Sequence, residues 1–179
     1  GRAVDLAYQY SGYLVSSHSW QSGEASHASL VLAVPADSPL TITSIEELRG
    51  GGIKRIAITD PETSPLGAAA VEVLTTLGIL DAVQPRLIYA KNVSQALTYV
   101  EEGEVDAGLM FATDAKAGGD KVKVVATSDP GWHGEIAFVL ATVSASENKA
   151  LGQSFIDFVL GPEGQAILTK HGFLPPPAS

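Results

Sequence analysis

The chain has 179 residues and a net charge of −9, because 20 Asp and Glu outnumber 11 Lys and Arg. Such an acidic chain is poorly suited to neutralise phosphates, so we expect neither nucleic acid nor an anionic membrane as a partner. The absence of cysteine excludes thiol catalysis, disulfides and cysteine-based zinc sites. The sequence also shows no signal-peptide pattern and no apolar run near the roughly 20 residues of a spanning helix.

The predicted strands are compact apolar runs bounded by Pro, Gly or Asp. A first strand is expected at 4–8, and the Ser-rich stretch 11–29 after it has no clean period, so it is predicted to be mostly loop. Further strands are expected at 29–34, 55–59, 86–89, 105–111, 122–126 and 136–143.

Helix signals alternate with these strands. Ser44 and Glu47 form a capping-box pattern that predicts a short helix at 43–48. Pro65 opens a helix that runs to about residue 77. A helix is expected at 93–102, where Asn92 is the predicted N-cap and the apolar period is 3.6. Two more are expected at 146–160 and 162–170. This alternation is typical of an α/β fold with a largely parallel sheet.

Two junctions between a strand and a helix carry the main functional hypothesis. Helix starts leave backbone N–H groups unpaired at the positive end of the helix dipole, which favours an anion. In a parallel sheet both junctions lie at the carboxyl ends of strands, where ligands bind. Most such junctions bind only water, so the pattern leaves anion binding open. The residues concerned are Ser64, Leu66 and Gly67 at the first junction, and Asn92 and Val93 at the second.

Catalytic alternatives have less support in the sequence. A serine hydrolase usually places its nucleophile in Gly-x-Ser-x-Gly, which does not occur here; Ser11 with His18 or His27 is the nearest substitute. The four histidines lack the spacing of paired metal ligands, so no metal site is predicted.

Several motifs follow one another along about 29–173. They are Ile56-Ala57-Ile58-Thr59-Asp60-Pro61-Glu62 with Pro65-x-Gly67, then Asn92-Val93-x-x-Ala96-Leu97, Gly108-Leu109-Met110-Phe111-Ala112-Thr113-Asp114-Ala115, and Pro162-Glu163-Gly164-Gln165-Ala166. Together they resemble the periplasmic molybdate-binding proteins of ABC transporters. The order and spacing of the motifs are more specific than any single piece.

The resemblance implies a type II periplasmic-binding-protein-like fold that holds a tetrahedral oxyanion between two lobes. One complete lobe would span 31–135, and a partial lobe would combine 1–30 with 136–179. The chain crossings at 29–34 and 136–143 would form the hinge. The protein would then be a binding protein for an ABC importer rather than an enzyme, periplasmic or extracytoplasmic, with no cofactor and a membrane permease as its partner.

The resemblance also implies the site residues. The second-lobe donors to molybdate or tungstate would be the backbone N–H groups of Leu66 and Val93. Phe111 stands where the family often has a tyrosine, so one hydroxyl donor is missing. The loss of one donor to a buried anion costs about 1.5–3 kcal/mol unless another group replaces it.

A second departure concerns the first lobe. The family's opening segment, with a strand, a helix and two anion loops, has no counterpart here. We therefore expect exposed apolar surface, covered by a homodimer partner or a complementing chain. Two alternatives also remain: a sensor domain that uses the same fold with another ligand, and a relative that binds nothing and acts through protein association.

Overall fold

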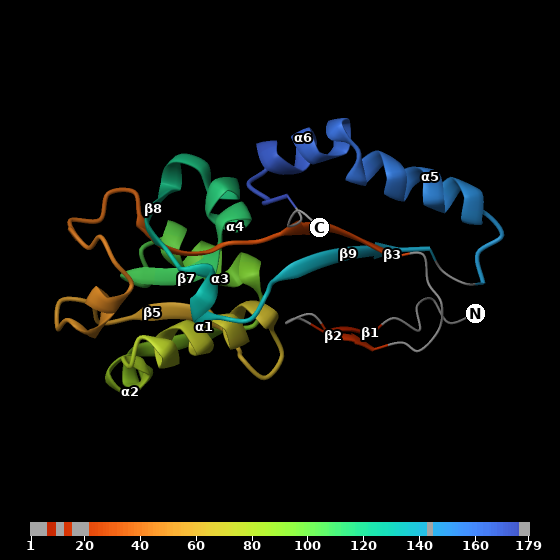
Figure 1. Cartoon of the computed structure of the whole chain (residues 1–179). Coiled ribbons are helices and arrows are strands. Elements are labelled where there is room, and N and C mark those ends of the chain that lie inside the picture. Colours follow the sequence, from red (N-terminus) through yellow and green to blue (C-terminus); the bar gives the residue numbers. More distant parts are fainter. Residues whose placement is uncertain (1–6, 10–12, 16–21, 143–144, 176–179) are drawn as a thin grey trace. The chain divides into compact units, whose positions relative to one another are not determined.

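The computed structural model describes residues 7–9, 13–15, 22–142 and 145–175. The chain divides into two compact units (Figure 1). Residues 29–134 form the larger one, here called the sheet unit. Residues 1–28 and 135–179 form the other, here called the terminal unit. The chain therefore crosses between the units twice, at 28–29 and at 134–135.

The sheet unit is built on a five-stranded sheet with the order β6-β5-β7-β4-β8. In it β5 pairs in parallel with β6 and β7, whereas β4 pairs antiparallel with β7 and β8. Four of the five strands therefore run in one direction, which confirms the expected α/β class with a mostly parallel sheet. The strands are β4 (Leu30–Pro35), β5 (Ile56–Thr59), β6 (Leu87–Ala90), β7 (Ala107–Phe111) and β8 (Val122–Thr127).

The central strands are buried along their whole length. Every residue of β4, β5 and β7 is buried, which is why these strands read as continuous apolar runs in the sequence. Gly108 of β7 allows helix α3 (Val93–Glu101) to approach closely, since a Cβ there would come within 2.8 Å of Val100 Cγ2. The core of the sheet unit lies between this sheet and its helices.

Two of the predicted helices flank the sheet as expected: α1 (Pro65–Thr76) and α3. Two shorter ones, α2 (Leu80–Val83) and α4 (Ala112–Ala117), have too few residues for a helical period to be visible in the sequence. Four 3-10 turns complete the unit: η1 (Glu46–Arg49), η2 (Gln84–Arg86), η3 (Gly119–Lys121) and η4 (Pro130–Trp132).

The helix expected at 43–48 was wrong in kind and position, because the structure has only the turn η1 there. Its cap differs as well. The Glu47 carboxylate accepts hydrogen bonds from the backbone N and the Oγ1 of Thr43, at 3.1 and 3.0 Å. These bonds favour the ionised carboxylate and lower the pKa of Glu47. The pairing of Glu47 with Thr43 fixes a turn four residues long instead of starting an α-helix.

Arg86 fastens the loop before β5 to α2. Its guanidinium donates to the carbonyl oxygens of Leu48, Gly50, Ile53 and Ala82, at 2.8, 2.9, 2.5 and 3.1 Å. A single planar group with several donors can satisfy backbone carbonyls from two segments at once. Arg86 is therefore a structural anchor.

In its described residues the terminal unit contains two antiparallel strand pairs and two helices. Strand β3 (Ser22–His27) pairs with β9 (Ala137–Ala141), and β1 (Ala7–Gln9) pairs with β2 (Tyr13–Val15). The stretch 11–29, predicted to be mostly loop, thus contains β2 and β3. The prediction failed because Ser-Gly-Glu-Ala-Ser-His has no apolar alternation, and its partner strand lies more than a hundred residues away. The strand expected at 4–8 falls mostly outside the described residues.

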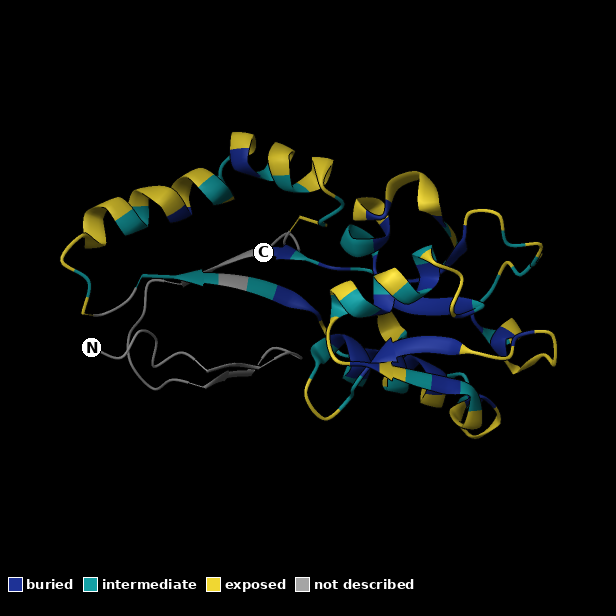
Figure 2. Ribbon diagram, turned by 180° about the vertical axis from the view of Figure 1, so that it is seen from behind, coloured by how far each residue is buried: buried dark blue, intermediate teal, exposed yellow. Residues whose placement is uncertain are grey.

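The helices of the terminal unit are α5 (Lys149–Leu160) and α6 (Pro162–Lys170), and both were predicted. Figure 2 colours much of both helices as exposed. Their exposed residues include large apolar ones. On α5, Leu151, Phe155 and Phe158 are 71%, 58% and 45% exposed. Their spacing of four and three residues places them on one helix face, here called the α5 face.

Among the described residues no single helix is long and apolar enough to cross a membrane. In the same part of the chain, α1 and the segment Leu80–Arg86 together have the length and composition of a span, but they are bent by 116° against each other. Half of the residues of α1 are buried within the sheet unit, as in an ordinary core helix.

Candidate functional site

The start of α1 is packed tightly against the end of β5. A Cβ on Gly67 would lie 2.2 Å from the carbonyl oxygen of Thr59, a distance that no side chain tolerates. The loop between them is fixed by its own hydrogen bonds: Ser64 N donates to Asp60 O at 2.9 Å, and Glu62 N donates to Asp60 Oδ1 at 2.9 Å. The glycine in Pro-x-Gly is therefore a steric requirement of this junction.

The start of α1 has two backbone N–H donors without a hydrogen-bond acceptor. Pro65 has no N–H, and the first helical bond runs from Ala68 N to Ser64 O at 3.0 Å. The N–H groups of Leu66 and Gly67 have no hydrogen-bond acceptor among the described residues. They are the orphan donors that a helix start offers to an anion.

The start of α3 is organised differently. The Asn92 side chain accepts from Gln95 N at 2.9 Å, and the Gln95 side chain accepts from Lys91 N at 2.7 Å. This reciprocal cap satisfies two donors and confirms Asn92 as the predicted N-cap. The N–H groups of Val93 and Ser94 have no acceptor in the part of the chain that the structure describes.

The sheet brings the two helix starts to the same edge. Thr59 and Ala90 are parallel register partners at the ends of β5 and β6, and Asp60 N donates to Ala90 O at 3.1 Å. The two junctions therefore leave the sheet from adjacent positions at the carboxyl ends of their strands. This edge is where α/β sheets bind ligands.

Phe111 ends β7 at this edge, on the other side of β5. It is 8% exposed and opposes Leu30, the first residue of β4. Its ring has no hydroxyl, so it contributes apolar surface and no donor. All six residues that the sequence singled out thus belong to three neighbouring strand ends: Ser64, Leu66, Gly67, Asn92, Val93 and Phe111.

Asp114 is a charged group near the site that the sequence reasoning did not single out. It is the third residue of α4, directly after β7, and its Oδ2 atom is buried with no partner among the described residues. Burial raises the pKa of the Asp114 carboxyl, opposed in part by a hydrogen bond from the backbone of Phe111. The only available signal was its position three residues after the predicted strand end.

The second crossing is fastened to α1 within the sheet unit. Gly134 N donates to Glu72 Oε2 at 2.6 Å, and Thr76 Oγ1 donates to Trp132 O at 3.1 Å. Residues 131–134 and this side of α1 line an open hollow of about 380 Å³. These bonds tie the segment that leads out of the sheet unit to the helix whose other end carries the unpaired donors.

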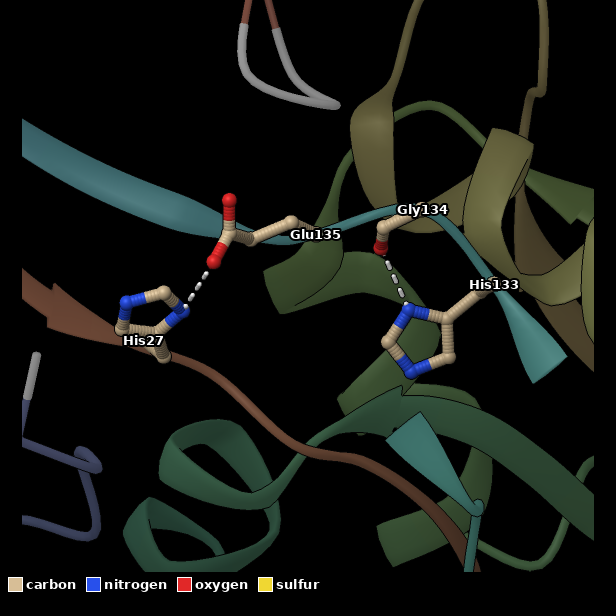
Figure 3. A network of polar contacts seen from close by, with 4 residues as sticks. All are labelled: His27, His133, Gly134 and Glu135. Atoms are coloured by element: carbon tan, nitrogen blue, oxygen red, sulfur yellow. Dashed lines mark hydrogen bonds and ion pairs between the residues drawn. The ribbon is translucent and has the colours of Figure 1, made fainter. Parts of the chain in front are cut away.

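Figure 3 shows the histidine contacts next to this crossing. His133 Nδ1 lies 2.6 Å from Gly134 O, so Nδ1 carries the proton, because a carbonyl oxygen only accepts. Its Nε2 lies 3.2 Å from the Oγ of the buried Ser128. In the terminal unit, His27 Nδ1 lies 3.5 Å from Glu135 Oε1.

These histidines are engaged in structural contacts. Among the described residues no group of three His, Asp or Glu could hold a metal ion. Ser11 and His18, the other members of the hydrolase hypothesis, lie outside the described residues.

Comparison with known proteins identifies the family. A model of the bacterial extracellular solute-binding proteins matches residues 9–174. The chain belongs to this family. Its members are substrate-binding proteins and not enzymes, as the sequence predicted.

Relatives within this group include two molybdate-binding proteins named ModA. The one from Escherichia coli is 37% identical over 137 residues, which are 76% of this chain and 51% of that protein. The one from Haemophilus influenzae is 31% identical over 149 residues, with 80% of this chain and 57% of that protein covered. The chain thus spans about half the length of the curated relatives it matches.

Solved structures give the same fold. The periplasmic molybdate-binding protein of Azotobacter vinelandii matches with a TM-score of 0.72 at 25% identity, over 87% of this chain and 68% of that one. The sulfate-binding protein SubI of Mycobacterium tuberculosis matches with a TM-score of 0.71 at 16% identity, which shows the fold alone. The expected periplasmic-binding-protein-like fold is confirmed.

Proposed function

We propose that this solute-binding protein captures a tetrahedral oxyanion, molybdate or tungstate, for an ABC importer. The observation that carries the proposal is the pair of helix starts at adjacent strand ends, each with unpaired backbone donors. Relatives of known name that match most of the chain bind molybdate. Together these point to Leu66 and Val93 as donors to the anion.

The chemistry of this edge suits an oxyanion despite the net charge of −9. Backbone N–H groups at helix starts supply local positive potential whatever the total charge of the chain. Hydrogen bonds to an ionised oxygen are roughly twice as strong as neutral ones. A partly dehydrated dianion is therefore held by neutral donors without needing a lysine or arginine.

Selectivity would come from closure. Size-matched donors on two lobes select an anion when a hinge brings the lobes together over it. In the proposal the two chain crossings form that hinge. The hinge expected at 29–34 and 136–143 needs a correction, because β4 and β9 occupy those stretches and each is paired in a sheet of its own unit. The chain passes between the units at 28–29 and 134–135, so the proposed hinge lies there.

The remaining partners follow from the same proposal. The family description is extracellular, so we place the protein outside the cytoplasm with a membrane permease as recipient of the anion.

For the α5 face we propose a second copy of the chain as its cover, because Leu151, Phe155 and Phe158 form a continuous exposed stripe. A monomer by light scattering at tens of micromolar protein would contradict that pairing.

Thermal unfolding with molybdate, tungstate, sulfate or phosphate tests the function. Saturation at a hundred times Kd stabilises a protein by ~2.7 kcal/mol, which for this size raises Tm by roughly 5–10 °C. We expect this rise with molybdate and tungstate and little with the others. No rise with any anion would favour the non-binding alternative instead.

A matched pair of variants at Val93 sharpens the test. Val93 is the first residue of α3, where proline is tolerated, and Asn92 before it has the extended backbone that precedes proline. Val93→Pro removes the N–H and should abolish most of the molybdate-induced rise. Val93→Ala removes only side-chain atoms and keeps the N–H, so its rise should equal that of the unsubstituted chain.

A further inference from the structure

Gly134 is the last residue of the sheet unit before the second crossing, and side chains hold both polar groups of its backbone. Its N–H donates to Glu72 Oε2 at 2.6 Å. Its carbonyl oxygen, which belongs to the peptide bond to Glu135, lies 2.6 Å from His133 Nδ1 (Figure 3). Two side chains therefore set the orientation of the peptide at which the chain leaves the sheet unit.

Both of these side chains are connected to fixed parts of the sheet unit. Glu72 belongs to α1, a helix with half of its residues buried. His133 Nε2 lies 3.2 Å from Ser128 Oγ, and Ser128 N donates to Leu30 O at 2.9 Å. Leu30 begins β4, the strand that follows the first crossing. A chain of hydrogen bonds thus links the second crossing both to α1 and to the strand that leads away from the first.

A second bond joins α1 to the segment before the crossing. Thr76 Oγ1, at the end of α1, donates to Trp132 O at 3.1 Å. An open hollow of about 380 Å³ lies between this side of α1 and residues 131–134. The segment is therefore held to the helix by the bonds from Glu72 and Thr76 rather than by continuous packing.

The opposite end of α1 carries candidate donors to the anion. Leu66 and Gly67 lie in its first turn, whereas Glu72 and Thr76 lie in its second half. A helix packed into a close-packed core is stiff and transmits displacement along its length. While its two bonds are made, α1 and residues 131–134 form one body, and bending between the units is confined to the chain beyond this segment.

We propose that Glu72, supported by Thr76, is a positioning residue that fastens the second crossing to the anion-binding helix, so that the hinge bends only beyond Gly134. This inference rests on the proposed function and assigns a role in anion capture to residues that contact no ligand. With the bonds in place, little ordering is needed when the lobes close on the anion. Loss of the Glu72 bond frees residues 131–134, and closure then costs more conformational entropy.

The test measures the spread of distances between two spin labels, one on each unit, by pulsed electron paramagnetic resonance. The sequence has no cysteine, so Ala82→Cys and Ala166→Cys, at exposed positions of α2 and α6, introduce the two attachment sites. An excess of unlabelled chain is added, so that only distances within one chain are measured. Calorimetric titration with sodium molybdate gives Kd for the same variants without labels.

Without anion, Glu72→Ala should broaden the distance distribution. Thr76→Val should broaden it less, because a neutral hydrogen bond is weaker than one to a carboxylate. Glu72→Gln keeps an oxygen that accepts from Gly134 N, so it should restore most of the narrow distribution. Kd for molybdate should rise roughly 3- to 10-fold in Glu72→Ala. Its Tm without anion should change little, because Glu72 is exposed and water replaces the lost bond.

Glu102→Ala is the matched control. Glu102 is exposed at the end of α3 in the same unit, so this variant also loses one carboxylate. Its distance distribution and its Kd should equal those of the unsubstituted chain. Equal broadening in Glu102→Ala and Glu72→Ala would assign the effect to the charge of the chain and overturn the inference.

The other outcomes separate the inference from the proposed function. If Glu72→Ala leaves the distance distribution or Kd unchanged, the inference is overturned and the proposed function stands. If Glu72→Gln broadens the distribution as much as Glu72→Ala, the acceptor oxygen is not what holds Gly134, and the inference is again overturned. If the unsubstituted chain binds no molybdate but Glu72→Ala broadens the distribution, the proposed function fails while the fastening by Glu72 stands.

Discussion

The starts of α1 and α3 present the same kind of donors at neighbouring strand ends, but they are built in different ways. The α3 start is closed by its own residues, since Asn92 and Gln95 cap each other's segment. The α1 start is shaped by the sheet, because Gly67 and Ser64 are placed by contacts with Thr59. A local cap tolerates change around it, whereas a start defined by tertiary contacts depends on each of them.

The largest expected effect is at Gly67, where the α1 start touches the sheet. Gly67→Ala places a methyl group against the Thr59 carbonyl and forces α1 away from β5, which we expect to destabilise the chain by ~3 kcal/mol and to abolish anion binding. Urea unfolding measures the loss. The third residue of α3 is Gln95, and Gln95→Ala should cost far less. Equal losses at the two positions would contradict the comparison.

Phe111 extends the comparison to the third strand end. Phe111→Tyr introduces a hydroxyl at the buried end of β7, which should lower Tm without anion because the new hydroxyl lacks a partner. If the new hydroxyl donates a hydrogen bond to the anion, Kd for molybdate should fall roughly 10-fold. Phe173→Tyr in the terminal unit is the control and should leave Kd unchanged. An unchanged Kd for Phe111→Tyr would place this ring outside the site.

The cap of α3 can be removed on its own. Asn92→Ala deletes the acceptor for Gln95 N and should destabilise the chain by about 1 kcal/mol. Ser64→Ala removes no cap at the equivalent position of α1, so any loss that it shows comes from the buried Thr59 hydroxyl, which is left without its acceptor. An unchanged stability of Asn92→Ala would contradict the local cap of α3.

The smallest expected effect is the pH response of Asp114. Its folded-state pKa is raised above the ordinary value of 3.8. Between the unfolded-state and the folded-state pKa, the native chain therefore binds more protons than the unfolded chain, and the free energy of unfolding falls as the pH rises through this range. Asp114→Asn removes this cost and should have a higher Tm than the parent at about pH 7.5, with the difference vanishing near about pH 3. A lower Tm at about pH 7.5 would show that the ionised carboxylate has a stabilising partner.

Much of the fold could be predicted where structure is local. The strands around Leu30–Pro35 and Ile56–Thr59 are buried on both sides, so their apolar runs are unambiguous. Pro65 and Asn92 mark helix starts by their own backbone and side-chain chemistry. The strand β3 could not be predicted, because its polar sequence becomes a strand only through pairing with β9.

For the candidate site, the sequence by itself determined which residues are candidates: Pro and Gly at one junction, an N-cap Asn at the other, and a phenylalanine at the third strand end. These are signals of local chemistry and of family resemblance. Only the tertiary structure decided that β5 and β6 end side by side, that Gly67 lies against Thr59, and that Ser64 is held away from its own helix. Each of these depends on the packing of segments onto a sheet, which no spacing along one chain encodes.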